Sequence, residues 1–352
     1  MENPGGVFSQ KYSDDSLINK TGVQIILAII GIVFLYTMPL WASNYFLEFV
    51  NRISIICIAA IGLNILTGVT GQISMGQAAM MAVGGYTSAI LTTAVGFPFW
   101  LSLPCAALVT GLVGILFGLP SVRLKGFYLL MTTLAAHFII LYVIQRWSSL
   151  TGGVNGISNI PAPELLGYSF GSIQGFFYLI MTILLLGVFI SRNLIRSKIG
   201  RAFVAIRDND KAAQMMGVNI SYYKLLSFFI GCAYAGVAGC LLVHWQYGVV
   251  PEQFTLADAV WYVGYVIIGG MGTSTLGPIF GVVFIESILE ILSGLLTSLG
   301  SSLPNIFSIL SAGKSIAFGI VMVLFLIYEP RGLHHRWELF KSYYRMWPFS
   351  VK

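Results

Sequence analysis

The chain has 352 residues, of which 57% are hydrophobic and only 9% charged, and its formal net charge is +6 at pH 7. A soluble domain has about 25% charged residues, so this composition excludes an ordinary globular enzyme and indicates a polytopic membrane protein. Basic loops between membrane spans explain the positive charge without a nucleic-acid partner.

Apolar stretches long enough to cross a hydrocarbon core of about 30 Å recur along the whole chain. We therefore expect an all-α polytopic membrane protein with about ten transmembrane helices. The predicted spans are 23–40, 47–66, 76–95, 100–118, 125–145, 174–191, 222–244, 258–270, 277–298 and 312–329. They define a transmembrane domain at 23–329, flanked by tails at 1–22 and 330–352. The polar first 22 residues do not resemble a cleavable signal peptide.

The distribution of basic residues predicts the orientation of this domain. With ten spans and both termini in the cytoplasm, 16 of the 19 Lys and Arg residues lie on the cytoplasmic side. Only Arg52, Arg146 and Lys314 then lie on the outer side. Because cytoplasmic loops carry an excess of Lys and Arg, this asymmetry favours cytoplasmic termini and an even number of spans.

Two Gly-rich segments that contain hydroxyl side chains, 62–76 and 264–277, each lead into a long apolar stretch. An offset of 201 aligns Gly71, Ser74, Met75 and Gly76 with Gly272, Thr275, Leu276 and Gly277. A broken-helix motif that occurs twice is typical of a transporter core built from repeats, although glycine and serine also allow two helices simply to pack closely. We expect the two segments to line the translocation path, with these candidate residues: Asn64, Gly71, Gln72, Ser74, Gly76, Gln77, Gly270, Gly272, Thr275 and Gly277.

The segment 192–221 is a polar, basic interruption between two apolar stretches. It predicts two short helices, 198–206 and 210–216, with Asp208 or Asn209 as N-cap of the second and Gly217 at its C-cap. Helices this short are marginal alone in water, so they need a surface to pack against. That surface is either a cytoplasmic partner protein or the lipid headgroups.

Catalytic and nucleotide-binding motifs are missing from the sequence. It contains no GxxxxGK[ST] loop and no HExxH, and its histidines and cysteines show no metal-ligand spacing. Any ATP that drives the protein must therefore be bound by another subunit. Glu286 and Glu290 share one helix face, which suits a structural or pore-lining role or a proton relay. We expect His137 and His244 to be core residues that form hydrogen bonds between helices.

Several linked motifs carry a resemblance to a known family, which covers residues 50 to 331. Lys211-Ala212-Ala213-x-x-x-Gly217 is similar to the E-A-A-x-x-x-G core of the loop by which ABC importer permeases contact their ATPases, with Lys211 in place of the Glu. The wider chain resembles the permease family of high-affinity branched-chain amino acid ABC importers in these segments: 200–208, 216–218, 223–225, 62–68, 71–76, 151–157, 269–273 and 277–278.

This resemblance implies a permease subunit in the cytoplasmic membrane of a bacterium or archaeon. The implied partners are a second homologous permease chain, two ABC ATPase subunits that bind ATP and Mg, and a periplasmic or lipid-anchored substrate-binding protein. The implied ATPase-coupling residues are Arg201, Arg207, Ala212, Ala213 and Gly217. Two alternatives stay open: a permease of the same family for urea, short amides or other small polar solutes, and a stand-alone ion-coupled secondary transporter. The latter would use Glu286 and Glu290, or His137.

Overall fold

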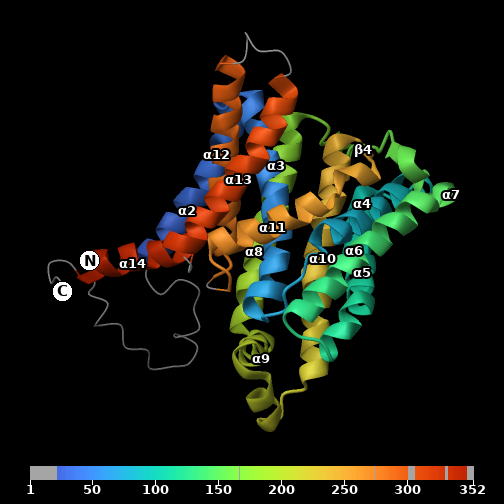
Figure 1. The fold of residues 1–352 in the computed structure, drawn as a ribbon. Coiled ribbons are helices and arrows are strands. Elements are labelled where there is room, and N and C mark those ends of the chain that lie inside the picture. Colours follow the sequence, from blue (N-terminus) through green and yellow to red (C-terminus); the bar gives the residue numbers. More distant parts are fainter. Residues whose placement is uncertain (1–21, 166, 273, 300–305, 330–331, 347–352) are drawn as a thin grey trace.

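A computed structural model describes residues 22–165, 167–272, 274–299, 306–329 and 332–346 (Figure 1). The predicted N-terminal tail, 1–22, therefore lies almost entirely outside the described residues. Within these residues the fold is a helical bundle with four two-residue strands (Figure 1).

A helix overlaps each of the ten predicted spans. In chain order these are α2 (Gly22–Thr37), α3 (Asn44–Leu63), α4 (Gln77–Thr93), α5 (Phe99–Gly118), α6 (Phe127–Arg146), α8 (Ile173–Arg196), α10 (Ile220–Gln246), α11 (Leu256–Gly269), α12 (Gly277–Leu299) and α13 (Ile306–Tyr328). Among the described residues, three further α-helices lie outside the predicted spans: α7 (Ser148–Thr151), α9 (Lys198–Met215) and α14 (Leu333–Met346). The last of these was not predicted and occupies the C-terminal tail.

The helices differ in their capacity to cross a membrane. Within the described residues, six are long and apolar enough to span, or seven if the bent pair formed by α13 and α14 is one span. The helices α2, α4 and α11 have 16, 17 and 14 residues, and each is too short to cross a membrane by itself. The structure thus establishes a multi-pass helical membrane protein and leaves the number of ten spans unconfirmed.

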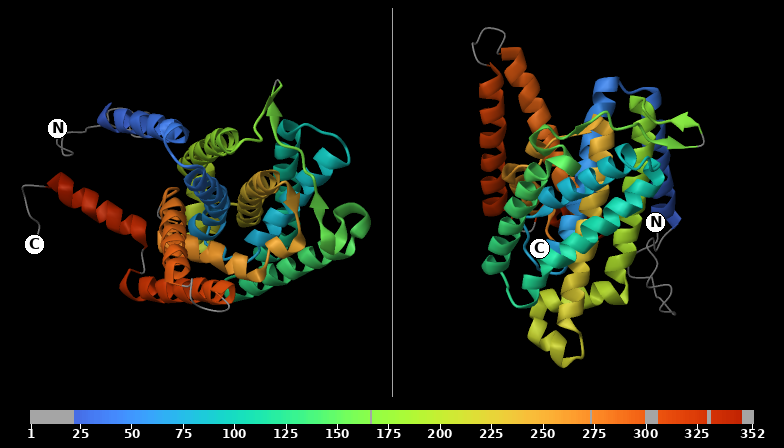
Figure 2. Two further views of the ribbon diagram at one scale, coloured as in Figure 1. Left: turned by 90° about the horizontal axis from the view of Figure 1, so that it is seen from above. Right: turned by 90° about the vertical axis from the view of Figure 1, so that its right-hand side faces the viewer.

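Helix α10 forms the centre of the bundle and packs against α3, α4 and α5 (Figure 2). Glycine permits the closest of these approaches. A methyl group added at Gly84 would overlap the backbone of Gly236, and one added at Gly239 would overlap the carbonyl of Met81. Small residues at helix crossings are what membrane packing favours, because lipid supplies no hydrophobic driving force between helices.

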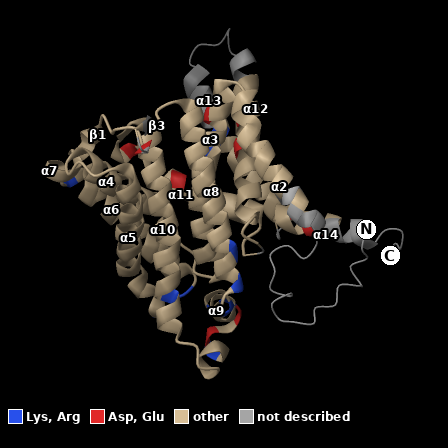
Figure 3. Cartoon of the chain, turned by 180° about the vertical axis from the view of Figure 1, so that it is seen from behind, with Lys and Arg blue, Asp and Glu red and all other residues tan. Residues whose placement is uncertain are grey.

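The polar elements gather at the two ends of the bundle. Helix α9 lies beneath one end, where Lys and Arg residues cluster (Figure 3). At the other end β1 (Ile157–Ser158) pairs with β4 (Gly248–Val249), and β2 (Glu164–Leu165) pairs with β3 (Tyr168–Ser169). The first pair joins the long loop after α6 to the loop after α10 and so anchors the long loop to the bundle.

Candidate functional site

Helix α9 is two helices joined at Asn209, as the sequence predicts. Asn209 has extended backbone angles (φ −159°, ψ 104°), and its Oδ1 accepts a hydrogen bond from the amide of Ala212 at 3.2 Å. Asn209, rather than Asp208, is therefore the N-cap of the second helix. Gly217 ends that helix with φ +84°, and the amide of Val218 donates to the carbonyl of Ala213 at 3.0 Å. The predicted C-cap is confirmed.

The first half of α9 is fastened to the bundle. The Ser197 hydroxyl caps it by accepting from the amides of Ile199 and Gly200. Ala202, Phe203 and Ile206 are buried, and the Phe203 ring meets Tyr223 of α10 edge-on, with ring centroids 6.3 Å apart. This half thus packs on the protein.

The second half projects away from the bundle and exposes two methionines. Met215 and Met216 are 89% and 85% exposed, whereas Ala213 is 5% exposed. Ala212 is exposed as well. Flexible, polarizable methionines on a small projecting helix are suited to the groove of a partner protein. We call this exposed surface, made by Ala212, Met215 and Met216, the methionine knob.

Arg207 connects α9 to the first Gly-rich segment. Its guanidinium donates from Nη1 to the carbonyl of Gly68 at 3.2 Å, and its side chain packs over Gly71. Gly68 lies in a π-helical turn, Asn64–Val69, at the end of α3. Short π-helical insertions are frequent at functional sites. The predicted coupling residue Arg201 lies farther out, where it is exposed and donates to the carbonyl of Arg196 at 3.3 Å.

The two Gly-rich segments meet each other directly. Asn64 Oδ1 accepts from the amide of Gly272 at 3.0 Å, and Asn64 Nδ2 donates to the carbonyl of Ser274 at 3.2 Å. Gly71 and Gly272, which the repeat aligns, both have positive φ, at +75° and +68°. Shared left-handed backbone at aligned positions supports a structural repeat, because that conformation strongly favours glycine. A side chain on Gly272 would also overlap Gly68 and Arg207.

A second connection runs from α9 to α6 and α10. Asp210 forms an ion pair with Lys125, and the Lys125 ammonium holds the pKa of that carboxyl below its usual range. The Lys224 ammonium donates to the carbonyl of Ser121 at 3.0 Å. Lys125, Asp210 and Lys224 line a cavity of about 280 Å³ together with Thr70, Gly71, Gln72, Leu124, Gly126, Leu129, Ile206, Arg207, Asp208 and Asn209.

The other predicted path residues are buried and serve helix contacts within this chain. Gln72 donates to Ser227 Oγ at 2.6 Å, and Gln77 donates to the carbonyl of Ala59 at 2.7 Å. Ser74 Oγ accepts from the amide of Gly76 at 3.2 Å, and Thr275 is 4% exposed. Gly270 (φ +109°) ends α11, and Gly277 begins α12. The structure brings the two predicted segments together at Asn64 and Gly272.

Sequence reasoning missed Gly68, Lys125, Asp210 and Ser274. Gly68 and Ser274 act through backbone carbonyls, which carry no sequence signal. Lys125 lies in the turn before α6, and Asp210 lies in the polar helix α9, where charged residues are ordinary. Nothing in their local sequence marks them as partners.

The two histidines differ. His244 Nδ1 lies 2.9 Å from the carbonyl of Pro161, and its Nε2 lies 2.9 Å from Ser88 Oγ, which confirms a hydrogen-bonded core residue. His137 is fully buried against Phe138, and neither ring nitrogen has a hydrogen-bond partner among the described residues. The predicted core position of His137 is thus confirmed, whereas its predicted hydrogen bond between helices is wrong. Among all the residues that the structure describes, no group of three or more His, Cys, Asp or Glu could hold a metal ion.

Comparison with known proteins gives one consistent family. The family model described as "Branched-chain amino acid transport system / permease component" matches residues 45–326. The chain is 32% identical over 318 residues to the high-affinity branched-chain amino acid transport system permease protein LivM of Salmonella typhimurium, covering 84% of this chain and 71% of that protein. It is 30% identical over 350 residues to LivM of Escherichia coli, covering 93% and 79%.

An archaeal protein is also similar. A probable branched-chain amino acid transport permease protein LivM of Methanocaldococcus jannaschii is 28% identical over 240 residues, covering 66% of this chain and 67% of that protein. No solved structure matches the chain significantly.

Proposed function

We propose a mechanism from the premise that this chain belongs to the permease component family of branched-chain amino acid transport systems. It is an ABC transport permease subunit and not an enzyme. Its substrates are branched-chain or related hydrophobic amino acids, as the names of its relatives indicate for those proteins. The observation that carries the mechanism is the chain of contacts from α9 through Arg207 to Gly68, beside the Asn64–Gly272 contact.

The proposed topology has ten spans with both termini in the cytoplasm. It requires α2, α4 and α11 to cross together with the segments that extend them, such as the Gly-rich stretches before α4 and after α11. Broken helices are tolerated at membrane depth where protein or a water-filled path surrounds them. The concentration of basic residues around α9 supports placing that end in the cytoplasm (Figure 3).

The methionine knob is the proposed contact with an ABC ATPase. ATP and Mg bind to the ATPase, and closure of an ATPase pair moves the second half of α9. The coupling residues have two different roles in this contact. Ala212, with Met215 and Met216, contacts the ATPase. The buried Ala213 and the capping Gly217 stabilise the helix that presents these residues. Arg201 is exposed on the first half and belongs to the outer part of the same contact.

Arg207 and Asp210 transmit that movement into the membrane. A displacement of α9 is transmitted to Gly68 through the Arg207 hydrogen bond. It is transmitted to the start of α6 through the ion pair between Asp210 and Lys125. Because Asn64 ties Gly68's segment to Gly272 and Ser274, both Gly-rich segments respond together. The ten candidate path residues lie in or beside these segments, and we place them along the translocation path.

The proposed assembly contains two ATPases, this chain, a second homologous permease chain and a binding protein that delivers substrate. An ABC permease implies ATPase and substrate-binding partners in general. The two-chain permease arrangement follows from the resemblance of the coupling loop and from the single copy of that loop in this chain.

Reconstitution tests this function. The chain is purified with its ATPases, permease partner and binding protein, placed in proteoliposomes, and assayed for uptake of radiolabelled leucine. Uptake should require ATP and the binding protein. Vesicles that contain this chain alone, with a proton or sodium gradient, form the control for an ion-coupled secondary transporter. Gradient-driven uptake by the chain alone, or uptake of urea but not of leucine, would contradict the proposal.

A further inference from the structure

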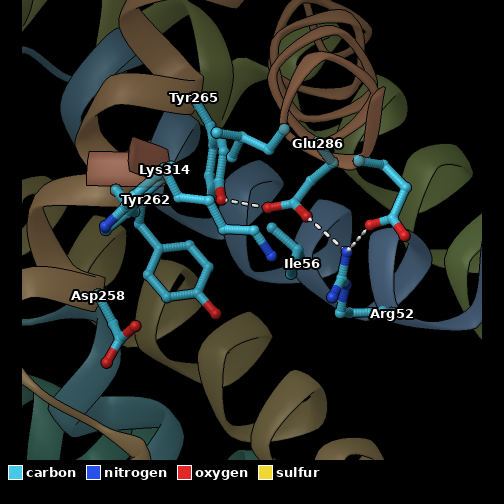
Figure 4. A pocket seen from close by; sticks show the side chains of 10 residues that line it. Arg52, Ile56, Asp258, Tyr262, Tyr265, Glu286 and Lys314 are labelled. Atoms are coloured by element: carbon cyan, nitrogen blue, oxygen red, sulfur yellow. Dashed lines mark hydrogen bonds and ion pairs between the residues drawn. The ribbon is translucent and has the colours of Figure 1, made fainter. Parts of the chain in front are cut away.

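A second cavity lies at the end of the bundle opposite α9, between α3, α11, α12 and α13 (Figure 4). Its volume is about 250 Å³. Ligand sites for drug-sized molecules enclose about 300 to 1,000 Å³, so this cavity suits a smaller solute. Five residues with acidic or basic side chains line it: Arg52, Asp258, Glu286, Glu290 and Lys314.

Arg52 forms the charged centre of this cavity. Its Nη2 lies 3.2 Å from Glu286 Oε2 and 3.2 Å from Glu290 Oε2 (Figure 4). The other oxygen of Glu286 accepts from the Tyr265 hydroxyl at 2.5 Å. The two carboxylates share one face of α12, as their spacing predicts. Charged side chains inside membrane spans are costly and mark functional positions by default.

The cavity retains cationic groups with unused capacity to bind an anion. Arg52 Nε is buried and has no hydrogen-bond partner among the described residues. Lys314 enters the cavity from α13 and makes no ion pair with any residue that the structure describes. A closed structural ion pair would leave no buried donor unpaired, because an unsatisfied buried donor costs about 1–3 kcal/mol.

Apolar side chains form the rest of the wall. Ile56, Leu289, Trp261 and Tyr262 face the same space. Trp261 is held in place by stacking on Phe318, with ring centroids 3.9 Å apart. Two signs of charge beside an apolar wall match a molecule that carries an ammonium, a carboxylate and an aliphatic side chain.

We propose that this cavity is a binding site for a zwitterionic α-amino acid on its way through the permease. Arg52 and Lys314 bind the carboxylate, Glu286 and Asp258 bind the ammonium, and the aliphatic side chain packs on Ile56, Leu289 and Trp261. This inference rests on the proposed function, which it deepens by assigning residues that select an amino acid over an uncharged amide.

The first experiment compares Arg52→Gln with the control Arg146→Gln. Arg146 is a basic residue at the end of α6, stacked over Tyr142 and outside the cavity. In proteoliposomes with the complete transporter, Arg52→Gln should lower leucine uptake roughly tenfold to a hundredfold, the effect of losing a charged hydrogen bond. ATP hydrolysis stimulated by the binding protein should persist. The control should retain both activities.

The second experiment does not depend on the Arg52 variant folding. Leu289→Cys is made after the four native cysteines are replaced by alanine, and its alkylation is followed in the detergent-solubilised complex. Leucine should slow the labelling of this cysteine. Neither 3-methylbutylamine, which lacks the carboxylate, nor 4-methylpentanoate, which lacks the ammonium, should protect it at the same concentration.

The outcomes of these experiments distinguish failure of the binding-site proposal from failure of the proposed function. A wild-type complex that takes up no amino acid contradicts the proposed function itself. A transport-competent complex in which leucine leaves Leu289→Cys labelling unchanged, or in which all three compounds protect equally, overturns the binding site alone. Equal loss of uptake and of complex assembly in Arg52→Gln, without leucine protection, assigns Arg52 a structural role and also overturns the site.

Discussion

Asn64 and Gly272, which are 208 residues apart in sequence, are joined by a hydrogen bond of 3.0 Å from the Gly272 amide to the Asn64 side chain. The same side chain donates to the carbonyl of Ser274. One amide side chain therefore satisfies two backbone groups of a segment that is not helical there. This contact fastens together the two Gly-rich segments near the point where Arg207 reaches Gly68.

Asn64→Ala should lower both stability and coupled transport. The substitution leaves the Gly272 amide and the Ser274 carbonyl without partners, at a cost of about 1–3 kcal/mol each if they stay dry. Asn51→Ala is the matched control, since Asn51 lies in α3, which leads into the turn that holds Asn64, and is equally buried. Among the described residues it makes one long hydrogen bond of 3.5 Å. Thermal unfolding in detergent and ATP-driven leucine uptake measure the two effects. Equal behaviour of both variants would refute the bridging role of Asn64.

Gly272→Ala should be more disruptive than an ordinary glycine substitution at positive φ. Left-handed backbone alone costs a non-glycine residue on the order of 1–3 kcal/mol. At Gly272 the new methyl group would also overlap the Gly68 carbonyl, so the two segments must separate. Gly96→Ala isolates the backbone cost, because Gly96 has φ +76° and nothing within 4 Å of an added methyl group. Uptake should fall in Gly272→Ala and stay near wild type in Gly96→Ala.

The sequence predicted the elements well because they depend on local chemistry. Apolar length located a helix at each of the ten predicted spans, and the side chain of Asn209 with the freedom of Gly217 located the ends of the second α9 helix. Gly71 and Gly272, which the predicted repeat aligns, both have positive φ. Each of these features is set by a few neighbouring residues.

The features that the sequence did not predict depend on contacts between distant segments. The Lys125–Asp210 pair and the Arg207–Gly68 hydrogen bond need the folded bundle to bring their partners together. Burial of Ala213 depends on which face of a short helix turns inward. The terminal helix α14 is mostly polar and lacks the long apolar stretch by which the other helices were identified.

Met216→Glu should uncouple ATP hydrolysis from uptake without preventing assembly of the bundle. Met216 is 85% exposed, so a carboxylate there disturbs no core contact and acts only on a partner surface. Ala213→Glu is a less specific probe, since Ala213 is buried and a charge there also destabilises the helix. Leucine uptake and ATPase activity of the reconstituted transporter are measured together. A Met216→Glu transporter with normal coupling would show that the methionine knob is not the ATPase contact.

Asp210→Asn should remove a modest stabilisation that is present at neutral pH and lost in acid. Pairing with Lys125 lowers the pKa of Asp210, so the folded state favours the carboxylate. A lowered folded-state pKa stabilises the fold above the unfolded value of about 3.9, and this contribution disappears as the pH falls through the folded-state pKa.

The magnitude of that effect is limited by solvent. The Lys125 side chain is 58% exposed, so water screens the pair and its contribution is about 1 kcal/mol or less. Thermal unfolding in detergent should thus show a constant small difference between wild type and Asp210→Asn from pH 8 to pH 5, which narrows below about pH 4. High salt should reduce the difference as well. A difference that grows on acidification would mean that Asp210 is protonated in the folded protein and that Lys125 does not hold α9 through charge.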